Sequence, residues 1–239
     1  MTTKSASPEE KPDATAQRVH RVGLVEDHTL MREGMKLFIG SVPGFRCIWA
    51  ASSAQEAIAM VEREEPNVLL VDITLPDRNG LEIVKDLRIT HPEIKVLVLS
   101  MHDEELYAHR ALKAGAKGYI MKNAPHDSIK AALQRVAEGG IFVSRAISER
   151  ILAAYSSGSK PRVDDGLHSL TDREFEVFQM IGEGKNTGQI ADALRISTKT
   201  VDVHKMNIRT KLNLHEGTEL TVYAVRWIEG QNRGPRERV

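Results

Sequence analysis

Five short apolar runs, separated by stretches of helical periodicity, constrain the fold of this chain more than any other feature. The runs lie between residues 21 and 121 and read RVGLVE, FRCIWA, NVLLVD, IKVLVLS and KGYIM. Runs that are apolar almost throughout suit strands buried on both faces, and strands that alternate with helices join in parallel through right-handed crossovers. We therefore predict an α/β domain over residues 20–142, a doubly wound five-stranded parallel sheet of the (βα)5 type.

A second, all-α pattern occupies the last third of the chain. Thr171 and Glu174 form a predicted capping box before an apolar stripe, and three helical segments follow: TGQIADAL, TKTVDVHKMNIRTKL and TELTVYAVRWI. They predict a small four-helix domain over residues 167–230, whose second and third helices are joined by a three-residue turn. Polar and small residues predict a linker at 143–166, a disordered tail at 1–19 and a polar tail at 231–239.

Charge and cysteine content narrow the classes of function. The chain has 33 basic and 33 acidic residues, so any charged partner must be recognised locally. The segment from Lys199 to Lys211 carries four basic residues against one acidic residue, a local charge of plus three. A single cysteine cannot form an internal disulfide, and no apolar run approaches the ~18 residues of a membrane helix. The sequence favours a cytoplasmic protein without a membrane partner.

Polar side chains end four of the five apolar runs. Glu26 and Asp27 end the first, Asp72 the third and Ser100 the fourth, and Lys122 follows the fifth. Ligands bind at the carboxyl ends of parallel strands, and three carboxylates gathered there require a cation such as Mg²⁺. A carboxylate could then attack a phosphoryl group while the lysine and the hydroxyl stabilise its oxygens. This pattern predicts a phosphoryl-acceptor site.

Each of these residues also has an ordinary structural interpretation. Asp27 could cap the helical segment that follows it, and Asp72 could begin the turn toward LPDRNG. The joint placement of an acidic pair, an aspartate, a serine and a lysine at the ends of the appropriate strands favours the phosphoryl-acceptor interpretation.

Residues 20–142 resemble the receiver domain of two-component response regulators. The resemblance rests on VEDH (25–28), VDITLPDRNG (71–80), LSMHDE (99–104) and GAKGYIMKNA (115–124). It implies that Asp72 accepts a phosphoryl group from a phosphohistidine on a sensor histidine kinase or phosphotransfer protein. It further implies that Lys122 pairs with the phosphate and that Ser100 and Tyr119 are switch residues. The implied Mg²⁺ ligands are Glu26, where many receivers have Asp, and Asp27, Asp72 and the backbone carbonyl of Thr74.

A phosphatase is the competing interpretation of this site. Haloacid dehalogenase phosphatases look locally similar, but their motif needs a second Asp two residues after the nucleophile, and here that position is Thr74. We therefore predict that the protein is not a multiple-turnover enzyme and that it catalyses at most its own phosphorylation and slow self-hydrolysis.

Residues 199–212 have the features of a helix that enters the DNA major groove, although a basic helix is also typical of a solvated surface. The run from 170 to 212 resembles the LuxR-type helix-turn-helix of the NarL/FixJ class of response regulators. The resemblance implies double-stranded DNA as a partner. It places Asp202, Val203 and Met206 near base edges, and Lys199, His204, Lys205 and Arg209 near phosphates. Asp202 could instead pair with a lysine of its own helix, and Val201 and Ile208 are expected in the core.

An apolar stripe runs along the last helical segment, at Leu220, Tyr223, Ala224 and Trp227. Such stripes are usually core, but the resemblance implies that part of this helix pairs two output domains in a homodimer. The whole sequence thus predicts a transcriptional regulator controlled by phosphorylation. A signalling adaptor whose helical domain no longer reads DNA is the alternative that zero net charge leaves open.

Overall fold

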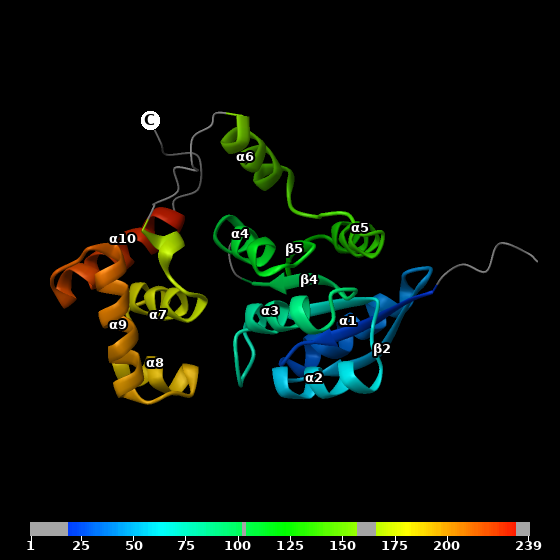
Figure 1. The fold of residues 1–239 in the computed structure, drawn as a ribbon, viewed down its shortest axis with the longest axis horizontal. Coiled ribbons are helices and arrows are strands. Elements are labelled where there is room, and N and C mark those ends of the chain that lie inside the picture. The colour runs from blue at the N-terminus through cyan, green and yellow to red at the C-terminus, as the bar shows by residue number, and fades with distance from the viewer. Residues whose placement is uncertain (1–18, 102–103, 157–165, 233–239) are drawn as a thin grey trace, which may run out of the picture.

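The computed structural model describes residues 19–101, 104–156 and 166–232. Most of the predicted tails at 1–19 and 231–239, and part of the predicted linker, therefore lie outside the described residues. In the described part, strands and helices alternate from β1 to α5, and the remaining elements are helices (Figure 1). None of the helices in these ranges is long and apolar enough to cross a membrane.

The first unit is a five-stranded parallel sheet of order β2-β1-β3-β4-β5, which confirms the predicted doubly wound fold. Its strands are β1 (His20–Val25), β2 (Phe45–Ala51), β3 (Val68–Asp72), β4 (Lys95–Ser100) and β5 (Gly118–Met121). Its helices are α1 (Thr29–Ser41), α2 (Ala54–Arg63), α3 (Gly80–Thr90), α4 (Glu104–Ala114) and α5 (His126–Ala137). Because β1 and β3 are neighbours, their carboxyl ends lie together in the middle of the sheet.

Two apolar layers cover the two faces of the sheet. Alternate residues of β3 belong to opposite layers: Leu70 packs in the layer that α1 and α5 contribute to, and Leu69 and Val71 pack in the layer of α2, α3 and α4. All five residues of β3 are buried, as expected for a central strand covered on both faces. The layer of α2, α3 and α4 continues into the second unit, where it includes Phe175 and Phe178.

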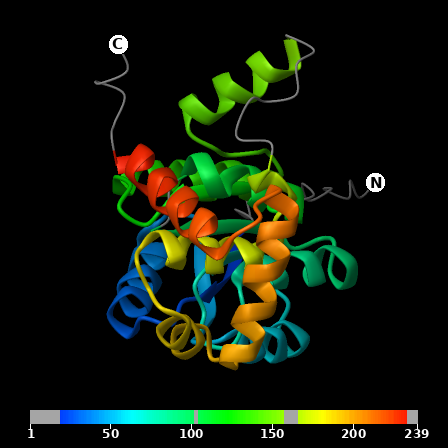
Figure 2. The ribbon, with the colours of Figure 1, turned by 90° about the vertical axis from the view of Figure 1, so that its left-hand side faces the viewer.

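The second unit is all-helical. It contains a short 3-10 helix η1 (Leu167–Ser169) and the helices α7 (Asp172–Gly182), α8 (Thr187–Leu194), α9 (Thr198–Leu212) and α10 (Gly217–Asn232). The predicted capping box at the start of α7 is confirmed, since Thr171 and Glu174 exchange both hydrogen bonds. In Figure 2, α9 and α10 face the viewer, on the side turned away from the sheet.

Helix α6 (Arg145–Ser156) lies in the stretch predicted as a linker. All 12 of its residues fall within the stretch 143–166. Ser144 initiates it, because its backbone amide donates to Glu104 at the start of α4 and its hydroxyl accepts from the amide of Ile147. The part of this segment nearest the first unit is therefore attached to α4.

Candidate functional sites

The sheet brings Glu26, Asp72, Ser100 and Lys122 to one edge, as the sequence predicted from the carboxyl ends of the strands. Lys122 Nζ lies 2.6 Å from Glu26 Oε2 and 2.8 Å from Asp72 Oδ2. Glu26, Asp72 and Ser100 are 1%, 3% and 0% exposed. The backbone amide of Lys122 donates to the Ser100 carbonyl at 2.8 Å, which holds the ends of β4 and β5 together. One ammonium therefore serves two buried carboxylates.

Burial dominates the electrostatics of Asp72. Desolvation raises its pKa from 3.8 to about 6, against the lowering effects of the Lys122 ammonium and of a hydrogen bond from the Thr74 backbone, while Glu26 raises it further. The pKa of Lys122 is also raised, because attraction to Asp72 and Glu26 outweighs its own desolvation. Asp72 is thus an ionised carboxylate at neutral pH whose charge is only partly compensated.

A divalent cation fits this edge by charge and by ligand type. Asp27 adds a carboxylate that is 30% exposed, so three carboxylates face one ammonium, a formal charge of minus two. Ligand atoms of Glu26, Asp27 and His28 lie within 4.8 Å of one another. Carboxylate oxygens with residual negative charge are the donors that Mg²⁺ prefers.

The structure adds two residues that sequence reasoning missed. Arg32 donates from Nη1 to the backbone carbonyls of Glu26 and Asp27, at 2.8 and 3.1 Å, and so fixes the loop after β1. Asp77 accepts from the backbone amides of Ala54 and Gln55 at the start of α2, which ties down the loop after β3. Nothing in the local sequence distinguishes Arg32 from an ordinary helix-surface residue, or Asp77 from an ordinary turn residue.

Tyr119, the predicted aromatic switch residue, is fully buried in β5. Its backbone amide donates to the carbonyl of Phe142 at 2.9 Å. The side chain lies within electrostatic reach of the buried Tyr107 on α4, whose pKa is raised by burial first and by Tyr119 among its neighbours. The structure therefore describes a state in which this ring is turned inward.

Helix α9 presents a mixed surface of the kind that the sequence predicted. Its core residues Val201 and Ile208 are completely buried, as expected, while Val203 and Met206 are 44% and 51% exposed. Asp202 and Lys199 are exposed as well, and Arg209 is half-buried.

Two of the predicted phosphate-contact residues on α9 have specific neighbours. Lys205 Nζ donates to Thr187 Oγ1 at 2.6 Å, in the first turn of α8, where positive helix-end charge attracts phosphate. Thr187 is thus a candidate DNA-contact residue that the sequence analysis missed. His204 is half-buried, its Nδ1 is buried, and desolvation together with Arg173 lowers its pKa. Of the predicted phosphate contacts, His204 has the least support from the structure.

The apolar stripe on α10 packs inside the second unit. Leu220 and Ala224 are 2% and 0% exposed. Trp227 stacks edge-to-face on Phe178 at 5.4 Å between ring centroids, and Tyr223 lies 5.8 Å from the same ring. Leu220 and Ala224 are therefore not accessible to a second copy in this structure, because they fill the space between α10 and α7.

Comparison with known proteins supports both units. The family model described as "Response regulator receiver domain" matches residues 22–134, and that described as "Bacterial regulatory proteins, luxR family" matches residues 168–224. The chain is similar to the transcriptional regulatory protein DegU of Brevibacillus brevis, with 34% identity over 87% of this chain and 95% of DegU. It is also similar to the oxygen regulatory protein NreC of Staphylococcus aureus, with 32% identity over 86% of this chain and 97% of NreC.

Solved structures share the fold. A two-component response regulator of the LuxR family from Aurantimonas sp. SI85-9A1 matches 58% of this chain and 99% of its own, with 28% identity and a TM-score of 0.54. RcsB of Salmonella enterica serovar Typhimurium, bound to a promoter with the phosphomimetic BeF3⁻, matches 86% of this chain and 98% of its own, with 20% identity and a TM-score of 0.59. The chain belongs to the NarL/FixJ class of two-component response regulators, transcriptional regulators that join a receiver domain to a LuxR-type DNA-binding domain.

Proposed function

We propose that Asp72 is the phosphoacceptor of this regulator and that a sensor histidine kinase, or a phosphotransfer protein, is the donor. The observation that carries the proposal is the position of Asp72: it ends β3, it is buried, and its only partly compensated carboxylate lies 2.8 Å from the Lys122 ammonium. A pKa of about 6 keeps the carboxylate ionised, and thus nucleophilic, at neutral pH.

The reaction follows from these residues. An Asp72 carboxylate oxygen attacks the phosphorus, the bond from phosphorus to the donor imidazole nitrogen breaks, and an acyl phosphate forms on Asp72. Lys122 exchanges its contact with the carboxylate for one with a phosphoryl oxygen, and Ser100 donates its hydroxyl to another. Glu26, Asp27, Asp72 and the Thr74 backbone carbonyl would hold Mg²⁺, which would supply positive charge to offset the negative charge of the phosphoryl oxygens. With Thr74 where a phosphatase has its second Asp, the same site hydrolyses the acyl phosphate only slowly.

Phosphorylation of Asp72 then shifts the receiver toward an active arrangement. Lys122 and Ser100 move toward the phosphoryl group and displace the ends of β4 and β5. Tyr119 in β5 changes its exposure as these strand ends move. The active receiver favours a homodimer that places two copies of α9 in successive major grooves of double-stranded DNA. Tyr223 and Trp227, half-buried on α10, remain the candidates from the apolar stripe for that dimer contact, next to the buried Leu220 and Ala224.

The DNA contacts are proposed for the outer face of α9. Asp202, Val203 and Met206 are exposed there and face the base edges, where the carboxylate can accept from cytosine and the apolar side chains can contact a thymine methyl. The phosphate contacts are assigned to Lys199, His204, Lys205 and Arg209.

Labelling with acetyl phosphate tests the acceptor assignment. The Asp72→Asn variant should lose all covalent labelling in the presence of Mg²⁺, as measured by intact-protein mass spectrometry. Asp86→Asn is the matched control, because Asp86 is a half-exposed aspartate on α3 that pairs with Arg78. Labelling of Asp72→Asn at the wild-type rate would refute the proposal.

Selection of genomic DNA fragments tests the output. The purified protein should enrich a common palindromic site when Mg²⁺ and beryllium fluoride are present, and should enrich it much less without them. No enrichment in either state would contradict DNA binding and favour the adaptor. Equal enrichment in both states would show that the phosphoacceptor does not control the output domain.

A further inference from the structure

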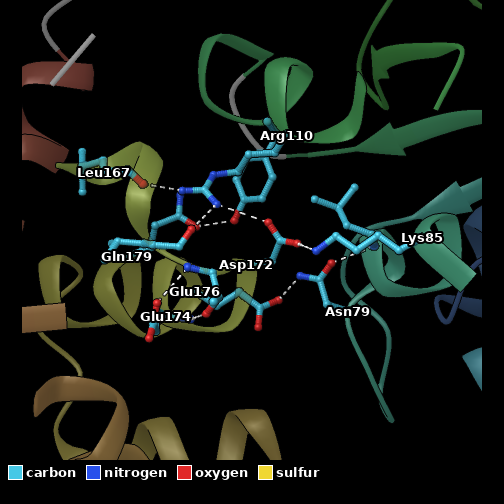
Figure 3. A network of polar contacts seen from close by, with 12 residues as sticks. Asn79, Lys85, Arg110, Leu167, Asp172, Glu174, Glu176 and Gln179 are labelled. Carbon is cyan, nitrogen blue, oxygen red and sulfur yellow. Dashed lines mark hydrogen bonds and ion pairs between the residues drawn. The ribbon is translucent and has the colours of Figure 1, made fainter. Parts of the chain in front are cut away.

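Helix α7 of the output domain packs against α3 and α4 of the receiver. Tyr107 on α4 donates its hydroxyl to Gln179, and Asn79 at the start of α3 donates its side-chain amide to Glu176. Glu176 and Gln179 lie three residues apart and so share one side of α7, where Figure 3 shows both contacts. A cavity lined by both units lies at the N-terminal end of this contact.

The cavity has a volume of about 570 Å³ and lies where the first turn of α7 meets the C-terminal halves of α3 and α4. Its lining includes four permanently basic side chains, Lys85 and Arg88 from α3 and Arg110 and Lys113 from α4, but only one acidic side chain, Asp172. The formal charge of plus three contrasts with the zero net charge of the whole chain. Sites for small molecules typically have volumes of about 300 to 1,000 Å³.

Asp172 pairs with only two of the four cations. Its Oδ2 lies 2.6 Å from Lys85 Nζ and its Oδ1 lies 3.2 Å from Arg110 Nη1, as Figure 3 shows. The Arg110 guanidinium also donates to the backbone carbonyls of Leu167 and Leu170, at 2.7 and 3.0 Å. Both oxygens of Asp172 and the guanidinium of Arg110 are therefore engaged within the protein.

Arg88 and Lys113 are the two cations of this lining that lack an acidic partner. Both are exposed, and neither forms an ion pair with any carboxylate in the described part of the chain. Each lies in the last turn of its helix, where a cation stabilises the unpaired carbonyls. For Arg88 that role uses one N–H, donated to the Lys113 carbonyl at 3.3 Å, out of the five that a guanidinium has. The other donors of Arg88 and the Lys113 ammonium are available to an anion.

The side chain of Arg88 is held in position by Gly115. This glycine has a φ of +121°, and a Cβ atom there would lie 2.7 Å from Arg88 Cδ. Only glycine permits both the backbone conformation and the close approach. Because the stem packs on Gly115 and Nη1 bonds to the Lys113 carbonyl, the guanidinium is ordered before a ligand arrives, which lowers the entropic cost of binding.

Part of the lining is apolar. The Ile89 side chain is 81% exposed, and Ala114 and Leu170 also line the cavity. An apolar side chain that is open to water gains free energy when a ligand covers it. Arginine binds phosphate oxygens in pairs, and lysine binds them as a point charge. The lining therefore suits a small molecule that joins phosphate groups to an apolar ring system.

We propose that this cavity is a binding site for a small polyphosphorylated metabolite of the nucleoside diphosphate class. Phosphate oxygens accept from Arg88 and Lys113, and the base packs on Ile89. The ligand supplies the negative charge that Asp172, already paired twice, does not supply. None of the lining residues belongs to the Asp72 site or to α9, so binding requires neither phosphorylation nor DNA. Because α3, α4 and α7 all line the cavity, the receiver and the output domain bind the ligand together.

Calorimetric titration of the full chain with ADP, GDP, CDP and UDP tests the site. The buffer contains EDTA, so that no divalent cation links a nucleotide to the carboxylates around Asp72. At least one of the nucleotides should bind with a Kd below about 1 mM. Arg88→Gln and Lys113→Gln should each weaken that binding about tenfold or more, because each removes hydrogen bonds between charged groups.

Arg63→Gln is the matched control, because Arg63 is an exposed arginine in the last turn of α2, as Arg88 is in the last turn of α3. It should bind the nucleotide as the wild type does. Since Arg88 and Lys113 are exposed, their variants should also keep the wild-type Tm. If Arg88→Gln lowers the Tm, Lys113→Gln alone decides the outcome.

Pyrophosphate tests the apolar part of the proposal. It should bind more weakly than the nucleotide, and Ile89→Ala should weaken nucleotide binding while leaving pyrophosphate binding unchanged. Equal affinities for pyrophosphate and the nucleotide, with no effect of Ile89→Ala, would overturn the assignment of a nucleotide.

The DNA backbone is the competing source of phosphate groups. A DNA duplex should bind Arg88→Gln and Lys113→Gln as tightly as it binds the wild type. Weaker duplex binding by these variants, without binding of any of the nucleotides to the wild type, would identify a DNA contact and overturn the proposal. Absence of nucleotide binding below about 1 mM, or an equal loss of binding in Arg63→Gln, would overturn it as well.

Discussion

Two buried carboxylates, one in each domain, both contact a lysine, yet their pKa values move in opposite directions. Asp72 in the receiver shares Lys122 with Glu26, and burial raises its pKa to about 6. Glu174 in the output domain is also desolvated, but a bond of 2.6 Å from Lys211 and the capping-box bonds with Thr171 outweigh this and lower its pKa. The difference separates a charge held for chemistry from a charge held for structure.

The physical origin of the contrast lies in the number of partners. Glu174 occupies the first turn of α7, where the backbone amide of Thr171 donates to it at 2.8 Å and the helix end favours negative charge. Asp72 lies at the end of a strand and competes with a second carboxylate for one ammonium. An ionised group that is under-compensated destabilises the fold and gains most from a bound cation or a phosphoryl group.

The largest expected effect on stability is that of Asp72→Asn. Since the folded pKa of about 6 lies above the ordinary 3.8, the folded state retains a proton that the unfolded state has lost between about pH 4 and pH 6. The stability of the wild type therefore falls as pH rises through this window, by about 3 kcal/mol, and stays low above it. Urea unfolding at pH 7.5 should show Asp72→Asn to be more stable than wild type by up to this amount, with the gain vanishing near pH 4.

Asp86→Asn controls for the loss of an aspartate from the same domain and should show little change at either pH. An equal gain for Asp72→Asn at both pH values would contradict the assigned cause, which is the ionisation of a desolvated carboxylate.

The output-domain carboxylate should give the opposite sign. Because the pKa of Glu174 is lowered, its contribution is complete above its ordinary value of 4.5 and is lost as pH falls through the folded pKa. Glu174→Gln should therefore lower the free energy of unfolding by about 1.5 to 3 kcal/mol at pH 7, the usual contribution of a hydrogen bond to a charged group. The same urea titration, repeated at pH 3, should show a smaller loss. Stabilisation at pH 7 would break the contrast between the two carboxylates.

Addition of Mg²⁺ should stabilise only the domain that has uncompensated charge. At a free Mg²⁺ concentration ten times the dissociation constant, linkage adds about 1.4 kcal/mol to the folded state. Calorimetry should show this as a higher Tm for the wild type and for Glu174→Gln, and as a much smaller shift for Asp27→Asn. A full Mg²⁺ shift in Asp27→Asn would remove Asp27 from the ligand set.

The smallest effect on stability is expected at the surface of α9. Lys205→Ala removes a bond to Thr187 and should change stability by less than about 0.5 kcal/mol. On DNA, its loss should reduce the salt dependence of binding by about one unit of slope for all sequences. Met206→Ala should instead change the preferred sequence and leave the slope as it is. Identical effects of both variants on every DNA sequence would contradict the separation of phosphate and base contacts.

The parts of the molecule that obey local or strand-end rules could be predicted from the sequence. The alternating runs predicted the parallel sheet, and the rule that strand ends meet at one edge predicted the meeting of Glu26, Asp72, Ser100 and Lys122. The capping box at Thr171 and the burial of Val201 and Ile208 are likewise confirmed. Each of these follows from spacing within one element or from the geometry of one sheet.

The contacts between the domains could not be predicted in this way. Asn79 and Glu176 are separated by 97 positions, and Tyr107 and Gln179 by 72. No periodicity relates such positions, and each residue has an ordinary local role, as a turn residue or as part of a polar helix face. Arg32 escaped prediction for a different reason, because its partners are backbone carbonyls rather than side chains of complementary charge.

The bridging position of α7 has a consequence for engineering hybrid regulators. Joining this receiver to a foreign helix-turn-helix domain at the linker leaves each domain sequence intact. Asn79, Tyr107 and Arg110 then face a helix that lacks their partners. A chimera that retains Asp172, Glu176 and Gln179 of this chain and replaces only the recognition helix keeps that match. The natural unit of exchange in this chain is therefore the recognition helix within its own helical frame, and not the whole output domain.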